Sequence, residues 1–146
     1  MPPRYFSLAL AFALAMTPVA SPAGTLQDAD WQLLAIDGVL VDASVTASLR
    51  IDAAGQVSGK APCNSYGAQN VAELPAFRLG PIRATRMACP KLAEEQVFFD
   101  TLALMETMAL DGPKTLVLTG PEGRSMEFVL ASVSSLPDCK TCPPTE

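Results

Sequence analysis

The sequence predicts an α+β domain in which a mainly antiparallel, strongly curved sheet of about seven or eight short strands packs on one helix. Three observations lead to this fold class. Apolar residues alternate with a period of two in several short segments, and Gly or Pro residues separate these segments. One late stretch has apolar residues at spacings of three and four instead, which is typical of a helix. The short connections favour pairing between strands that are neighbours in sequence.

The N-terminal half of the domain predicts a series of hairpins. The first expected strand is residues 30–36, DWQLLAI, and a turn follows at Asp37-Gly38. The segment 44–52, SVTASLRID, has a strong two-residue alternation. A turn at Gly55 then returns the chain into another short strand.

Further short strands are expected at 69–74, 76–80, 82–87, 114–120 and 124–131. Gly or Pro residues separate them, because these residues interrupt regular structure. The last two flank a Gly-Pro-Glu-Gly turn at 120–123.

The stretch 90–112 predicts the helix. Its apolar residues at helical spacing are Phe98, Phe99, Leu102, Met105 and Ala109. Pro90 suits the first helical position, and Gly112 suits the residue just beyond the end. Glu94 and Glu95 would lie in the first turn, where the helix macrodipole favours negative charge. Adjacent helical residues do not face each other, so we do not interpret these two carboxylates as a paired catalytic site.

The first residues of the chain predict export. Residues 1–23 combine one early positive charge, an apolar run too short to span a bilayer and a stretch of small residues, which is typical of a secretory signal peptide. We therefore expect a signal peptide at 1–23, a folded domain at 24–131 and a Pro- and Ser-rich tail at 132–146. Without residues 1–23 the chain would have nine basic and fifteen acidic residues, a balance that argues against nucleic acid as a partner.

Histidine is absent from the sequence. This composition excludes Ser-His-Asp triads, Cys-His dyads and zinc sites that need imidazole. Acid-base chemistry near neutral pH would require carboxylates, lysine, tyrosine or cysteine with shifted pKa values, and no pair of carboxylates in the sequence indicates such a site. We therefore expect a protein that is not an enzyme.

Several segments of the sequence resemble one known family. They are W31QLLAIDG38, G55QVSGKAPCNSY66, T85RMAC89, E95QVFFDTL102 and LVLTGPEGRSMEF, which ends at residue 128. Their order and spacing are similar to those of the META domain, a family that includes the HslJ-type heat-inducible envelope proteins. The specific part is the combination of Gly-x-x-x-Cys-Asn with Thr-x-Met-x-Cys.

The resemblance implies an exported, mixed α/β domain associated with envelope stress, with no catalytic residues to transfer. The matching motif residues, interpreted as structural, are Trp31, Gly59, Asn64, Tyr66, Thr85 and Met87. The sequence departs from the family at Pro62 and Ala68, where glycine is common. We interpret Asn64 as a turn residue that can bond its own backbone.

The four cysteines are expected to form disulfides, because export places them in an oxidising compartment. A Cys63–Cys89 bridge is the leading interpretation for the two motif cysteines; buried free thiols and redox or nucleophilic roles are the alternatives. In the tail, Cys139 and Cys142 predict a local disulfide. Pairing with other cysteines or another chain, metal binding and redox activity are the alternatives there.

Two further groups of residues have both a structural and a functional interpretation. Four basic residues could bind an anion or could be solvated strand ends: Arg78, Arg83, Arg86 and Lys91. Four methionines could suggest copper(I), although gap-filling in the core is the better interpretation of their spacing: Met87, Met105, Met108 and Met126.

Together these features predict a non-catalytic, periplasmic or secreted protein that binds or protects a component of the cell envelope under stress. Its partner would be an envelope protein or an apolar ligand held in the curved sheet. We expect a monomer without a cofactor, a metal or a membrane span in the mature chain. The alternative is a thiol-disulfide oxidoreductase or a metal-binding protein that uses Cys139 and Cys142.

Overall fold

The alternating apolar residues form the buried face of a single open sheet in the computed structural model, which describes residues 26–131. The strands are β1 (Trp31–Ile36), β2 (Val39–Leu40), β3 (Ser48–Ile51), β4 (Gln56–Lys60), β5 (Ser65–Gln69), β6 (Arg83–Ala84), β7 (Thr107–Asp111), β8 (Thr115–Thr119) and β9 (Ser125–Leu130). Their order is β6-β5-β4-β3-β1-β9-β8-β7, and β2 pairs with β1 alone. All the pairings between strands are antiparallel, as the fold-class prediction requires.

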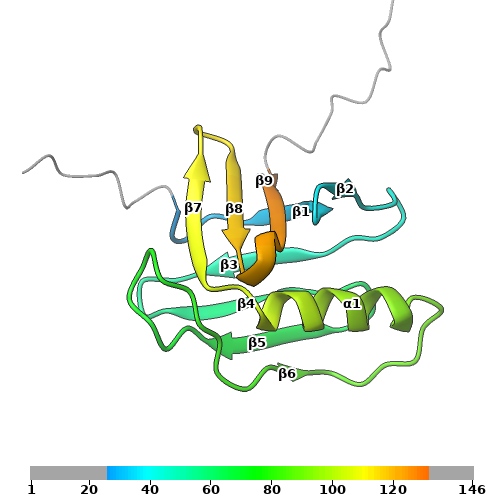
Figure 1. Ribbon diagram of the computed structural model, residues 1–146. Helices are drawn as coiled ribbons and strands as arrows, with labels where there is room; N and C mark the ends of the chain where they lie inside the picture. Colours follow the sequence, from blue (N-terminus) through cyan, green and yellow to red (C-terminus); the bar gives the residue numbers. More distant parts are fainter. Residues whose placement is uncertain (1–25, 132–146) are drawn as a thin grey trace, which may run out of the picture.

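The sheet is strongly curved, and the helix α1 (Leu92–Ala103) packs against it. Figure 1 shows β7 and β8 crossing the direction of β3, β4 and β5 steeply, while α1 lies in front of β4 and β5. Where β1 pairs with β9, the register shifts between Leu33 and Ala35. Such an irregularity bends a strand and increases its twist, so it contributes to the curvature here.

The helix is shorter than the sequence predicts. It starts at Leu92, two residues after Pro90, and ends at Ala103, so the prediction of helix for the stretch up to Gly112 was wrong. The last part of that stretch is β7, which pairs along its whole length with β8. Gly112 has a φ of +72° in the turn between these strands, not at a helix end. A positive φ suits both a helix terminus and a hairpin turn, so this glycine could not distinguish them.

The middle of the chain contains less strand than expected. The expected strands at 69–74 and 76–80 were wrong, since apart from the end of β5 these segments hold only isolated bridges, and β6 covers two residues of 82–87. Beside the bridge between Asn70 and Leu79, the side chain of Asn70 makes further hydrogen bonds to the backbone. Its Oδ1 accepts from the N–H of Arg78 (2.8 Å), and its Nδ2 donates to the carbonyl of Ala72 (3.0 Å).

Strand β5 was not expected. Its sequence, SYGAQ, has few residues with high strand propensity, but it pairs with the whole of β4, and this pairing buries Tyr66 and Ala68. Cross-strand pairing and burial stabilise strands more than intrinsic propensity does. The residues that follow the Cys63-Asn64 loop therefore form a regular strand of the sheet.

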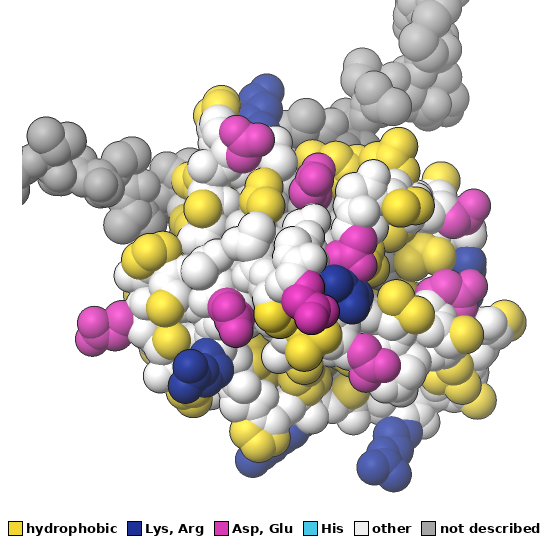
Figure 2. All heavy atoms as spheres, viewed as in Figure 1, with side chains coloured by type: hydrophobic (Ala, Val, Ile, Leu, Met, Phe, Trp, Pro, Cys, Tyr) yellow, Lys and Arg dark blue, Asp and Glu magenta, His cyan; other side chains and the backbone are white. Residues whose placement is uncertain are grey.

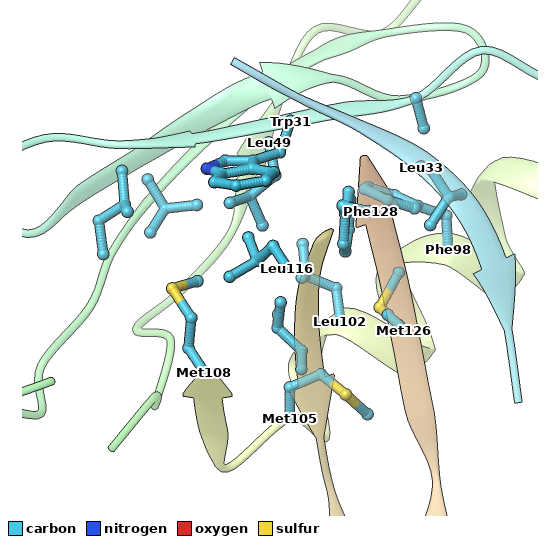
Figure 3. Close-up of a cluster of buried hydrophobic side chains, with 14 of the residues drawn as sticks. Trp31, Leu33, Leu49, Phe98, Leu102, Met105, Met108, Leu116, Met126 and Phe128 are labelled. Carbon is cyan, nitrogen blue, oxygen red and sulfur yellow. The ribbon is translucent and has the colours of Figure 1, made fainter. Parts of the chain in front are cut away.

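The core fills the space between the sheet and α1 (Figure 3). Trp31 is fully buried, and its Nε1 donates to the carbonyl of Leu26 (3.2 Å). The prediction that methionines fill the core is confirmed for Met105, Met108 and Met126. It was wrong for Met87, whose exposed fraction is 62%, because that residue lies in a surface segment after β6.

Candidate functional site

The two motif cysteines form a disulfide between distant segments. Cys63 lies between β4 and β5, Cys89 lies just before α1, and their Cα atoms are 5.9 Å apart. The N–H of Ala61 donates to the carbonyl of Asn64 (2.7 Å), so the loop closes around Pro62, one of the positions at which the sequence departs from the motif. Cys139 and Cys142 lie outside the described residues.

Asn64 joins three segments, which is more than its interpretation as a turn residue predicted. Its side chain is buried, and its Oδ1 accepts from the N–H of Met87 (2.7 Å) and from Thr85 Oγ1 (2.9 Å). Its Nδ2 donates to Glu95 Oε1 (2.7 Å). The interpretation of Asn64 as a turn residue was incomplete, because its hydrogen bonds to Glu95, Met87 and Thr85 reach segments that lie far away in sequence.

Glu95 completes this network, and the sequence did not identify it as a site residue. The carboxylate is buried, and its Oε2 accepts from the N–H groups of Cys63 (2.8 Å) and Asn64 (2.7 Å). With Asn64 Nδ2, three donors surround it. One signal could have indicated this role: Glu95 precedes the buried Phe98 by three residues, so both lie on the same face of the helix.

The motif residues Gly59 and Tyr66 meet on neighbouring strands where the backbone of β3 approaches. Gly59 pairs with Tyr66, whose hydroxyl donates to the carbonyl of Ser48 (2.9 Å). A Cβ atom on Gly59 would lie 2.0 Å from that same carbonyl oxygen. Tyr66 also contacts Phe98 and Phe99 of α1 edge to face, with ring centroids 5.5 and 5.6 Å apart, and burial raises the pKa of its hydroxyl.

We expect Gly59→Ala to lower the free energy of unfolding by about 2–3 kcal/mol, because the backbone of β3 would have to move away from the new methyl group. Gly67→Ala is the matched control on the adjacent strand, since its Cβ would meet no atom closer than 3.6 Å. That variant should stay within about 0.5 kcal/mol of the parent. Urea unfolding of both variants measures the difference, and equal midpoints would contradict the close approach at Gly59.

An apolar groove of about 630 Å³ lies beside the helix. Its floor includes Leu33 and Phe98, two core residues from β1 and α1 that lie at the same end of the cluster in Figure 3. Its walls include Val39 and Leu40 of β2 and Val97 of α1, all exposed. The groove thus connects the apolar core to the surface.

The β1–β2 hairpin forms one wall of the groove. It turns at Asp37 (φ +51°) and Gly38 (φ +74°), a pair of left-handed residues that matches the turn expected from the sequence. The Asp37 carboxylate lies 2.8 Å from Arg124 Nε, and the N–H of Ser125 donates to it (3.0 Å). The hydrogen bond from the Ser125 N–H lowers the pKa of Asp37 most, and Arg124 lowers it further. The Arg124 contact is an ion pair rather than a well-aligned hydrogen bond, since Nε has no hydrogen-bond partner of suitable geometry among the described residues.

Polar side chains form the rim of the groove. Lys91 Nζ donates to Ser44 Oγ (2.6 Å), and the hydroxyl and N–H of Ser44 both donate to Asp42. The pKa of Asp42 is lowered most by the hydrogen bond from the Ser44 hydroxyl, then by the bond from the Ser44 N–H, and further by the charge of Lys91. Glu94 lies exposed on the helix side of the rim.

Lys91 was expected to belong to a basic surface group, and the structure places it on this rim. The other three members, Arg78, Arg83 and Arg86, are exposed and make no ion pair with another described residue. On the face seen in Figure 2, Lys and Arg side chains are scattered and not gathered into one patch.

The buried network and the groove share the start of α1. Lys91 precedes the helix, and its N–H donates to Cys89 Sγ (3.4 Å). Glu94 and Glu95 follow within the first turn, one facing the rim and the other the buried network. The disulfide and the Glu95 hydrogen bonds therefore fix the helix end that forms one side of the groove.

A curved antiparallel sheet on one helix, with a disulfide-tied loop at the helix start and an apolar groove beside it, defines an α+β domain of the kind that the motifs indicated. The chain belongs to the META domain family, whose family model matches residues 24–133.

Solved structures show the same fold. A protein from Burkholderia xenovorans, solved by NMR, is 22% identical with a TM-score of 0.59, and the match covers 90% of this chain and 99% of that one. A DUF4847 family protein from Bacteroides vulgatus, solved by crystallography, is 9% identical with a TM-score of 0.55, over 71% and 93% of the two chains. These likenesses show the fold alone. The search of curated proteins found no match to the sequence.

A membrane-spanning helix is not found among residues 26–131, where no helix is both long enough and apolar enough.

Proposed function

We propose that this META-domain protein is exported to the periplasm or secreted, has no catalytic role and binds a small apolar ligand of the cell envelope in the groove beside α1. The observation that carries the proposal is the groove itself. Its volume of about 630 Å³ lies within the range of small-molecule sites, and the apolar floor continues the hydrophobic core. Exposed valine and leucine side chains on its walls would be covered by such a ligand.

The buried carboxylate supports a structural rather than a catalytic role for the motif residues. Glu95 accepts from two backbone N–H groups and from the side-chain amide of Asn64, so most of its acceptor capacity is already used to hold the disulfide loop. The Cys63–Cys89 disulfide is compatible with an oxidising, extracytoplasmic compartment. If stress releases the apolar ligand into that compartment, its binding in the groove would protect the cell envelope.

We expect Val97→Glu to weaken binding of the neutral fluorophore N-phenyl-1-naphthylamine at least about tenfold, because a carboxylate in the groove wall would have to lose its hydration. Val97 is 53% exposed on the helix, so the substitution leaves the core intact. The measurement is fluorescence titration of the purified, non-reduced protein.

Val71→Glu is the matched control, because Val71 is 63% exposed and does not line the groove. It should bind the fluorophore like the parent. The proposal is wrong if the parent does not bind the fluorophore, or if both variants lose binding equally.

A further inference from the structure

The rim of the groove has an uneven charge distribution that indicates which apolar ligands it favours. Three charged side chains line it: Asp42, Lys91 and Glu94. Lys91 donates to the Ser44 hydroxyl, which donates to Asp42. The Lys91 ammonium group and the Asp42 carboxylate are therefore already linked to each other through this hydroxyl. Glu94 makes no hydrogen bond or ion pair through its carboxylate with any described residue. At the mouth of the apolar groove, one carboxylate thus has no ion-pair partner among the described side chains.

We propose that the groove takes a cationic amphiphile, a small molecule with an apolar body and one amino or quaternary ammonium group. The apolar body would lie against Leu33, Val97 and Phe98, and the cationic group would lie beside Glu94. This inference rests on the proposed function, since it names the ligand class of the same groove.

The position of Glu94 supports this orientation of the ligand. Glu94 is three residues before Val97 on the helix, so its side chain and the apolar wall lie on the same face. A ligand that covers Val97 therefore ends within reach of the carboxylate.

An anionic amphiphile fits the rim less well. Its head group would meet Asp42 and Glu94, and the single lysine there is already engaged with Ser44. The chain as a whole has a net charge of −5, which repels anions and attracts cations over longer distances. Both effects act in the same direction, so the preference for a cation is a property of the site and of the protein around it.

Three probes with the same ten-carbon alkyl chain test the proposal: decyltrimethylammonium, undecanoate and decanol, the first two kept below their micelle concentrations and decanol below its solubility limit. Each competes with N-phenyl-1-naphthylamine for the purified, non-reduced protein at pH 7 and low salt. We expect decyltrimethylammonium to displace the fluorophore at a concentration about five- to tenfold lower than undecanoate, with decanol between them. Adding salt should reduce this preference, because an exposed carboxylate is screened.

Glu94→Gln separates the charge effect from apolar binding. The variant should reduce the preference for the cation over the anion about threefold and leave decanol binding unchanged. Glu73→Gln makes the same change at an exposed site that does not line the groove, and it should keep the full preference.

The outcomes distinguish this inference from the proposed function. If all three probes bind equally and Glu94→Gln changes nothing, the cation preference is wrong and the apolar site stands. If undecanoate binds more tightly than the cation, the charge argument is likewise wrong. If neither the fluorophore nor any probe binds, the proposed function fails as well.

Discussion

Replacing Glu95 with alanine should lower the free energy of unfolding by about 3–4 kcal/mol. The change leaves three donors without an acceptor: the N–H groups of Cys63 and Asn64 and the side-chain amide of Asn64. These groups are largely shielded from water, and each unsatisfied buried donor costs about 1–3 kcal/mol, although the costs do not add fully. Chemical unfolding of the non-reduced protein measures the loss.

Two variants show whether the hydrogen bonds cause this effect. Glu95→Gln keeps one acceptor oxygen for the two backbone N–H groups but turns an amide N–H toward Asn64 Nδ2, so we expect an intermediate loss of about 1–2 kcal/mol. Glu94→Ala removes the adjacent exposed carboxylate and should stay within about 0.5 kcal/mol of the parent. A loss for Glu95→Ala no larger than that for Glu94→Ala would show that the network does not stabilise the fold.

Removing the Cys63–Cys89 bridge should have an effect of similar size. The bond connects residues 26 positions apart, and the chain-entropy model gives about 3–4 kcal/mol for a loop of this length. The variant Cys63→Ala/Cys89→Ala should therefore unfold at a clearly lower denaturant concentration than the non-reduced parent. In a domain of this size, such a loss is a large fraction of the total stability.

Reduction with dithiothreitol provides the control. It should destabilise the parent by about the same amount as the double substitution, because both changes remove the cross-link that restricts the unfolded chain. It should have little further effect on Cys63→Ala/Cys89→Ala, and any remaining change would then report on Cys139 and Cys142. A parent whose stability is unchanged by reduction would contradict a stabilising role for the bridge.

Both changes act at the start of α1, where the buried network meets the groove. The hydrogen bonds of Glu95 and the bridge at Cys89 hold the turn that presents Lys91 and Glu94 to the rim. The network and the bridge thereby fix the positions of the charged side chains on the rim of the groove.

The sequence predicted the fold class because its strongest patterns are local. Alternation around Trp31 and Leu49, the Asp37-Gly38 turn and the helical spacing up to Leu102 each depend on residues close together in the chain. The family resemblance added the expected pairing of Cys63 with Cys89. These elements are present in the structure.

Tertiary contacts decided the rest. Residues 107–111 have a spacing compatible with a helix, but they form a strand because they pair with β8. Likewise, β5 has low intrinsic strand propensity, but it forms a strand because it pairs with β4. The role of Glu95 also depends on a loop more than thirty residues earlier in the chain, which supplies its donors. A local pattern contains no information about such distant partners, because hydrogen-bond ladders and buried carboxylates are stabilised only when the folded chain brings both sides together.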